Sequence, residues 1–461
     1  MTSVNSNIRC ALIPHAGIQY AGDARKSAFQ HFNGPDTKVI IYIATNHKPS
    51  TSNITYILYN NSKYKLPKDI YHKPIPYENE HSFKWVHDEL TSYFTNAKIL
   101  AIGPNQYNKK LKQWIVHFMK NTPKCILLAT TDLTHYGDIF NNSLMFKFPQ
   151  QLYKQRYEEE FISSLTRKPL NIRIVNRLLR KQDLMCGPMA TQLFIQVCNG
   201  LNYTGKVVDY YDSYGIENNP DSNRSDLLNR YIIQPNNIEH FVSYVSIVYG
   251  SGINQNKINQ FDILMGIGLV KSVMLRYLYK KYNNINHYNL KLPKWSPFYS
   301  IYSGVFVGTN IGTQTNCSYG RYENRTQTTA MKIRAASNDC PGDANNRWHT
   351  PYSLHDIGST QFKIELLQPK KEWKTYKGVQ AYQQFKIDGK HGLYLTLPSE
   401  RSATYLPVVA RDNLDWTVDQ YMRRLVRKAG GNGDEWKEGT IQIYTSTSYT
   451  WNPDSQKLEI F

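Results

Sequence analysis

Long hydrophobic runs are missing from this 461-residue sequence. No apolar stretch approaches the roughly 20 residues that a membrane-spanning helix needs, and the opening residues MTSVNSNIR lack the apolar core of a signal peptide. The composition is 41% hydrophobic and 20% charged, which argues against a disordered chain. We therefore expect a cytoplasmic protein without a membrane partner, folded into two or three globular domains.

Cysteine is also scarce. None of the six forms a CxxC pair or part of a dense framework, which argues against a zinc-ribbon or disulfide-rich scaffold. The sequence therefore predicts free thiols in a reducing compartment. The six are Cys10, Cys125, Cys186, Cys198, Cys317 and Cys340.

Acidic residues are too few to balance the basic ones. The formal net charge is +19 and the isoelectric point is about 9.4, which would suit a nucleic-acid partner. The excess is spread evenly, however: residues 1–250 hold 28 Lys and Arg against 19 Asp and Glu, and the remainder holds 27 against 17. The chain is also rich in Lys, Asn, Ile and Tyr, as an AT-rich genome would make it. Compositional drift is the favoured explanation, and a nucleic-acid partner stays open.

Strand and helix patterns alternate in the first half, which predicts an α/β sheet with helices on its faces. The predicted strands are Arg9–Pro14, Val39–Ala44, Ile54–Tyr59, Lys98–Ile102, Cys125–Thr130, Lys206–Tyr211 and Val242–Tyr249. The predicted helices are His81–Phe94, Leu111–Met119, Leu152–Leu165 and Ile172–Leu179.

The character of the chain changes after the stretch GSGINQN. Long helical patterns and short strands follow, which predicts a smaller α+β domain. Its predicted helices are Phe261–Tyr282, Thr328–Ala336 and Val418–Lys428. We therefore expect a first domain at residues 1–250, a linker at 251–256 and a second domain at 257–461.

Four short stretches of the first domain place reactive side chains where a strand ends or a helix begins. They are PHAG with His15, ATNHKP with His47, TTDLTHYG with Asp132 and His135, and MCGPMATQ with Cys186. Side chains at such positions face a shared crevice. Cys186 precedes a helical pattern, and a helix N-terminus favours a thiolate. Taken singly, each residue also has a structural explanation, as a turn cap, an N-cap or a small buried residue.

Together, in this order, these stretches resemble the Memo family. The family segments PHAGYxYSG, GPNH, EHSLE, SSDLSHYG and CG..PI correspond here to PHAGIQYAG, ATNH, EHSFK, TTDLTHYG and CGPMA. The second domain resembles the AMMECR family through GLYLTLPSERSATYLP and LVRKAGGNGDEW. The two kinds of domain occur fused or side by side in microbes, often with a radical-SAM protein, which makes such a protein a candidate partner.

The Memo resemblance implies the fold of class III extradiol dioxygenases, which are non-haem iron enzymes. It implies that His15, His47 and Cys186 bind a metal ion, and that His135 is a catalytic acid or base with Asp132 beside it. His81 is expected in the substrate pocket. Two imidazoles and a thiolate suit Fe(II) or copper, and zinc as well.

This chain departs from both families at defined positions. GPNH has become ATNH, and Lys84 replaces the second glutamate of EHSLE, which reverses a charge. The AMMECR segment LRGCIG is reduced to SGVFVGT, without its arginine and cysteine. Tyr405 and Pro407 match the late AMMECR motif, and we interpret them as packing residues.

Three functions follow from these observations. The first is metal-dependent redox or oxygenase-like chemistry in the Memo-like domain. The second is a non-catalytic protein that uses the same pocket to bind a small molecule or a peptide. The third is a basic structural or packaging protein of a large DNA virus, associated with the virion.

Overall fold

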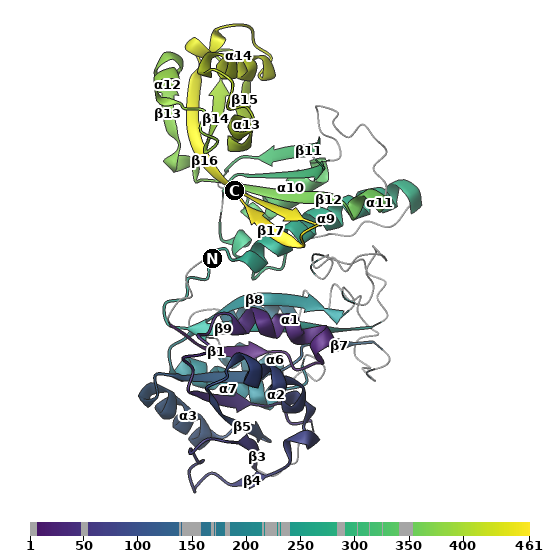
Figure 1. The fold of residues 1–461 in the computed structure, drawn as a ribbon, viewed down its shortest axis with the longest axis vertical. Helices are drawn as coiled ribbons and strands as arrows, with labels where there is room; N and C mark the ends of the chain where they lie inside the picture. Colours follow the sequence, from purple (N-terminus) through teal and green to yellow (C-terminus); the bar gives the residue numbers. More distant parts are fainter. Residues whose placement is uncertain are drawn as a thin grey trace. The chain divides into compact units, whose positions relative to one another are not determined.

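The computed structural model divides the chain into two compact units, residues 1–262 with 293–297 and residues 263–292 with 298–461 (Figure 1). Each unit is described by itself. The domain boundaries at residues 250 and 257 stay predictions. The structure describes residues 7–47, 54–137, 140, 158–166, 170, 172–179, 185–213, 216, 228, 231, 240–283, 291–301, 303–312, 314–324, 326–340 and 354–461.

A mixed β-sheet forms the centre of the first unit. Its strand order is β4-β3-β5-β2-β6-β1-β9-β7, with β8 paired to β9. Strands β5, β2, β6 and β1 run parallel, while β3 and β9 pair antiparallel with β5 and β1. All seven predicted strands are present, with ends within two residues of those expected. The bounds are β1 Ile8–Ile13, β2 Val39–Ile43, β3 Thr55–Asn60, β4 His72–Pro74, β5 Lys98–Pro104, β6 Cys125–Thr130, β7 His135–Tyr136, β8 Thr204–Asp212 and β9 Phe241–Gly250.

Helices cover both faces of this sheet. The described helices are α1 Ile18–Phe29, α2 His81–Tyr93, α3 Lys109–Asn121, α5 Glu159–Thr166, α6 Ile172–Leu179 and α7 Pro188–Gly200. Strand residues alternate between faces: Ile13 and Tyr42 join one core with Phe29 of α1 and Phe83 of α2. On the same strands, the intervening residues point to the opposite face, where α7 contacts β1, β5 and β6. Residues 152–157 of one predicted helix lie outside the described residues.

The segment after β9 lies along β8. Gln255 donates to the Gly205 carbonyl at 3.3 Å, and Asn259 donates to the Val207 carbonyl at 3.1 Å. Nζ of Lys206 lies 3.7 Å from Oδ2 of the buried Asp262. The chain is therefore fixed to the first unit up to the start of α9 (Gln260–Asn283).

The second unit is built on an antiparallel sheet in the order β11-β10-β12-β16-β14-β15, with β13 and β17 also paired to β16. Strand β16 pairs with β12 through its second half and with β13 and β14 through its first half. The strands are β10 Val305–Ile311, β11 Gln314–Arg321, β12 Thr360–Leu367, β13 Lys374–Lys377, β14 His391–Thr396, β15 Ser402–Tyr405, β16 Thr440–Asn452 and β17 Lys457–Ile460. The helices besides α9 are α10 Thr329–Asp339, α11 Leu354–Ile357, α12 Gly378–Gln384, α13 Pro407–Arg411 and α14 Val418–Lys428.

Two residues of the late AMMECR-like motif pack against the core of this unit. Tyr405 ends β15 and packs on Tyr421 of α14, with ring centroids 5.1 Å apart. Pro407 is buried at the first turn of α13. Both residues pack as expected.

The expectation of six free thiols is wrong, because Cys317 and Cys340 form a disulfide with Cα atoms 5.6 Å apart. Cys317 lies in β11 and Cys340 follows α10, and α10 packs against β11. The two cysteines are 23 residues apart and match no motif, so only the fold brings them together. The other four cysteines are free.

Within the described ranges, no helix combines the length and apolar character needed to cross a membrane.

Candidate metal centre

Three neighbouring parallel strands end at the site. The register pairs Ile13 of β1 with Thr130 of β6, and Ile43 of β2 with Ala129 of β6, so the carboxyl ends of these strands are level. His15 follows β1 and His47 follows β2, each within a few residues of the strand end. The fully buried strands are rigid platforms, and the loops after them bring distant parts of the sequence together.

Asp132 follows β6 and fixes the backbone of His15. The His15 N–H donates to Oδ1 of Asp132 at 2.8 Å, and Nε2 of the His15 ring lies 3.7 Å from Oδ2. Both residues are buried, with exposures of 2% and 4%. The loops after β1 and β6 are thus held together by one carboxyl group.

Cys186 lies against these two residues, just before helix α7. Its sulfur is 3.4 Å from Nε2 of His15 and accepts the Asp132 N–H at 3.2 Å. The Cys186 N–H in turn donates to the Asp132 carbonyl at 3.2 Å. The motif glycine makes this approach possible: a Cβ on Gly187 would lie 2.3 Å from Oγ1 of Thr45 and 2.8 Å from the Thr130 carbonyl.

Glu80 connects the other two histidines. Its Oε1 lies 2.7 Å from Nδ1 of His47, and its Oε2 accepts the His47 N–H at 3.1 Å. Glu80 is also the N-cap of α2, where it accepts the Ser82 N–H at 3.1 Å. His81 is the first residue of that helix, so the cap and the histidine contact come from one side chain.

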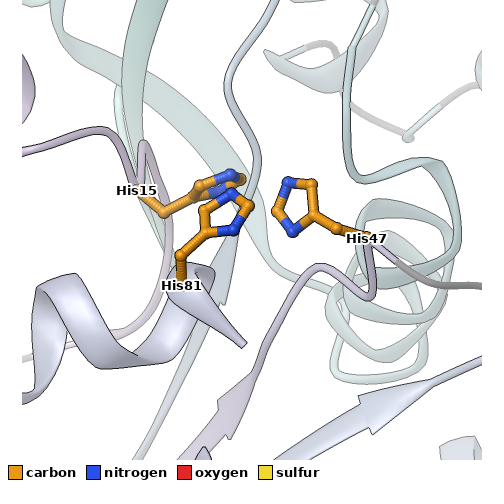
Figure 2. Close-up of side chains that lie close together, drawn as sticks. All are labelled: His15, His47 and His81. Atoms are coloured by element: carbon orange, nitrogen blue, oxygen red, sulfur yellow. The ribbon is translucent and has the colours of Figure 1, made fainter. Parts of the chain in front are cut away.

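The three histidines converge on one point, as Figure 2 shows. The ring centroids of His47 and His81 are 3.7 Å apart, and that of His15 lies 5.0 Å and 5.7 Å from them. Ligand atoms of the three lie within 4.8 Å of one another. A second group of the same kind consists of His15, Asp132 and Cys186, so His15 belongs to both. The predicted set of His15, His47 and Cys186 is therefore divided between two adjoining groups.

Burial favours the neutral form of His15 and of His81. It lowers the pKa of His15 well below its usual value, and the neighbouring His47, His81 and His135 lower it further. Burial and His47 likewise lower the pKa of His81. A neutral imidazole has a lone pair for a metal ion. The buried Nδ1 of His15 has no hydrogen-bond partner in the described part of the chain.

The pKa values of the two acidic groups nearest the histidines shift in opposite directions. Burial alone would raise the pKa of Glu80, but hydrogen bonds from the side chain and backbone of His47 and from Ser82 lower it to about 2. Burial raises the pKa of Asp132. The contacts of Glu80 therefore favour its ionised form, whereas burial disfavours the ionised form of Asp132.

The expectation that the helix N-terminus favours the Cys186 thiolate is wrong for the protein alone. Burial and the adjacent Asp132 raise the pKa of the thiol. A bound metal ion would favour the thiolate, because a metal ion deprotonates a coordinating thiol outright.

His135 lies in β7, next to the cluster. Its Nδ1 is 2.9 Å from the Leu133 carbonyl. A carbonyl oxygen only accepts, so Nδ1 carries a proton and Nε2 is the basic nitrogen of the neutral ring. The ring also meets Phe140 edge to face, with centroids 5.2 Å apart.

Two features of the site were missed from the sequence. The first is Glu80, although EHS was recognised as a segment; a glutamate at the N-cap position directly before a histidine was the available signal. The second is the packing requirement at Gly187. Lys84, whose charge differs from that of the family, is exposed on α2, so the reversal lies on the solvent side of the helix.

The comparisons with known proteins agree with the two halves of the fold. Residues 2–226 match the family model described as Memo-like protein, and residues 281–450 match the model of AMMECR1. The chain therefore joins a Memo-like region to an AMMECR1 region, which confirms both predicted resemblances.

One solved structure, that of the uncharacterized protein PH0010 from Pyrococcus horikoshii, is similar to 42% of this chain and is itself covered to 94%. The sequence identity is 16% and the TM-score is 0.36, a likeness too weak to support a conclusion about fold or function. No curated protein matches the chain.

Proposed function

We propose that the Memo-like region binds one metal ion through His15, His47 and Cys186 and performs redox or oxygen-dependent chemistry on a small molecule. The observation that carries the proposal is the group of His15, His47 and His81, of which His15 is buried, beside the Cys186 thiol. Imidazole and sulfur donors suit Fe(II), copper and zinc. The family's likeness to class III extradiol dioxygenases favours Fe(II), and the softer thiolate of Cys186 favours copper or zinc.

The surroundings of His15 indicate that these residues suit a metal ion. The buried Nδ1 of His15 lacks a hydrogen-bond partner among described residues, and its Nε2 faces sulfur and a carboxyl group. Glu80 accepts a hydrogen bond from Nδ1–H of His47, which leaves the lone pair on Nε2, the nitrogen that faces away from the carboxylate. A bound iron or copper ion would supply one-electron chemistry and polarise an oxygen atom of the substrate.

The remaining residues would position the substrate and move its proton. His135 has its tautomer fixed by the Leu133 carbonyl, so Nε2 can take a proton from a substrate hydroxyl and later return it. Asp132 holds the His15 and Cys186 backbones in place. Burial of His15 and Asp132 limits the access of water.

Metal content tests this proposal. Protein purified without air or chelators should contain one metal ion, and His47→Ala and Cys186→Ala proteins that remain folded should lose it, because an open three-ligand site has no spare donor. His117→Ala, at an exposed histidine of α3, is the control. Wild-type metal content in both site variants would contradict the ligand assignment.

A second function is favoured by one observation. Trp85 is 48% exposed, and its ring centroid lies 4.7 Å from that of His81. An exposed aromatic ring at the edge of a polar site is typical of ligand recognition. If the metal-loaded protein turns over no substrate but binds a small molecule or peptide that Trp85→Ala no longer binds, a non-catalytic binding role is the better description.

A further inference from the structure

We propose that His81 is an additional ligand of this metal ion, and that Glu80 positions His47 and His81 for it. This inference rests on the proposed metal centre and extends it to a donor set with three imidazoles. The sequence had indicated only that His81 lies in the substrate pocket.

The distances favour His81 as a donor. The ligand atoms of His81, His15 and His47 all lie within 4.8 Å of one another. The sulfur of Cys186 belongs instead to the group with His15 and Asp132. The His47 and His81 rings are inclined by 32° with their centroids 3.7 Å apart, so the two imidazoles are in contact beside the space that the ligand atoms of the three histidines share. Figure 2 shows the rings approaching that space from three different segments, the loops after β1 and β2 and the first turn of α2.

One carboxylate produces this convergence. Oε1 of Glu80 accepts hydrogen bonds from Nδ1 of His47 and from the backbone N–H of Ser82. Oε2 accepts a hydrogen bond from the backbone N–H of His47. His81 stands between Glu80 and Ser82 in the chain, inside the turn that this cap fixes. Glu80 is 5% exposed, so the hydrogen bonds form away from water, where they constrain geometry most strongly.

Hydrogen bonding among the histidines does not account for the cluster. Ring nitrogens without a proton present lone pairs, and several of them within 4.8 Å of one another are the kind of donors that a cation binds. The buried Nδ1 of His15, which has no hydrogen-bond partner among the described residues, is a second, independent observation that favours a bound cation. A first-row divalent cation, zinc, copper or iron, fits three imidazoles.

The test uses Co(II) and Zn(II) as probes on the full chain. Affinity is measured by competition with a chelator, and the Co(II) absorption spectrum reports the number and type of ligands. His81→Ala should weaken binding by more than about 100-fold, the upper end of what an outer-shell partner costs, and should change the Co(II) spectrum. His81→Phe keeps the ring volume without a nitrogen and should do the same. His117→Ala should match wild type in both measurements.

Glu80→Gln separates positioning from ligation. The amide has one oxygen acceptor where the carboxylate has two, so we expect affinity to fall about 10- to 100-fold while the Co(II) spectrum keeps its shape, because the ligands are unchanged. A spectrum altered as in His81→Ala would contradict the positioning role.

The outcomes distinguish this inference from the proposed function. If wild type binds the ion and His47→Ala does not, but His81→Ala and His81→Phe retain wild-type affinity and spectrum, His81 is not a ligand and only the further inference fails. If wild type takes up neither Co(II) nor Zn(II), the metal centre itself is wrong. Loss of affinity with an altered spectrum in both His81 variants supports the inference.

Discussion

His15 is bound to Asp132 through its backbone: the N–H of His15 donates to Oδ1 of Asp132 at 2.8 Å, although the two residues are 117 positions apart. The contact joins the loops that follow the neighbouring strands β1 and β6. Asp132 therefore has a structural task that is separate from any part in chemistry.

Replacement of Asp132 by alanine should reduce stability. It leaves the buried His15 N–H without an acceptor, which costs about 1–3 kcal/mol, and Asp132→Asn should cost less because an amide oxygen can replace Oδ1. Urea unfolding of the Memo-like unit measures the difference. Asp88→Ala is the control, since the Asp88 side chain is 99% exposed on α2. An Asp132→Ala midpoint equal to that of the control would show that the contact does not stabilise the fold.

Gly187→Ala should be more damaging than an ordinary glycine substitution. Its Cβ would lie 2.3 Å from Oγ1 of Thr45 and 2.8 Å from a backbone carbonyl, so the Cys186 loop must move. We expect a loss of about 1–3 kcal/mol, as for overpacking of a core, together with weaker metal binding. Gly103→Ala in β5 is the matched control, because its added Cβ would find its nearest atom at 3.8 Å. Equal stability of the two variants would rule out the proposed crowding.

The sequence could predict which loops meet at the site but not how they are joined. His15, His47 and Asp132 each follow an apolar strand pattern, and adjacent parallel strands bring such residues to one edge. The contacts that fix the rings depend on tertiary packing instead. Glu80 reaches His47 only because α2 packs beside β2, and Cys317 meets Cys340 only because α10 packs on β11. No local pattern encodes either pairing.

Asp262 should give the first unit a measurable pH dependence. Burial raises its pKa to about 6, although the neighbouring positive charge of Lys206 lowers the pKa in part. A carboxyl group whose pKa is raised on folding contributes stability that is complete below its unfolded value near 4 and is lost as the pH rises through 6. Relative to Asp262→Asn, wild type should therefore lose up to about 3 kcal/mol between pH 4 and pH 7.

Denaturant unfolding of both proteins across that pH range measures the effect. Asn259→Ala removes the Oδ1 that accepts the Asp262 N–H but retains the carboxyl group, so its stability should vary with pH as that of wild type does. Parallel curves for wild type and Asp262→Asn would contradict the raised pKa.

The Cys317–Cys340 disulfide should stabilise the second unit. Closing a loop of 23 residues lowers the entropy of the unfolded chain, which corresponds to about 3 kcal/mol. Cys317→Ser, Cys340→Ser and the double variant should therefore lose a similar amount, because each breaks the same bond. Cys125→Ser, at a buried free cysteine of the other unit, is the control. Peptide mapping without reductant should find this bond, and two free thiols at these positions in protein kept from air would exclude it.

His135 provides the sharpest distinction between catalysis and binding. Its Nδ1 donates to the Leu133 carbonyl, so Nε2 is the nitrogen that can exchange a proton with a substrate. In metal-loaded protein, His135→Ala and His135→Gln should lower oxygen consumption with catechols or thiols by about 10²- to 10⁴-fold, the usual contribution of general acid–base catalysis. Metal content should not change, because His135 belongs to neither candidate ligand group. His117→Ala should retain full activity. Equal oxygen consumption in wild type and both His135 variants would refute the catalytic role, and metal loss in these variants would make His135 a ligand instead.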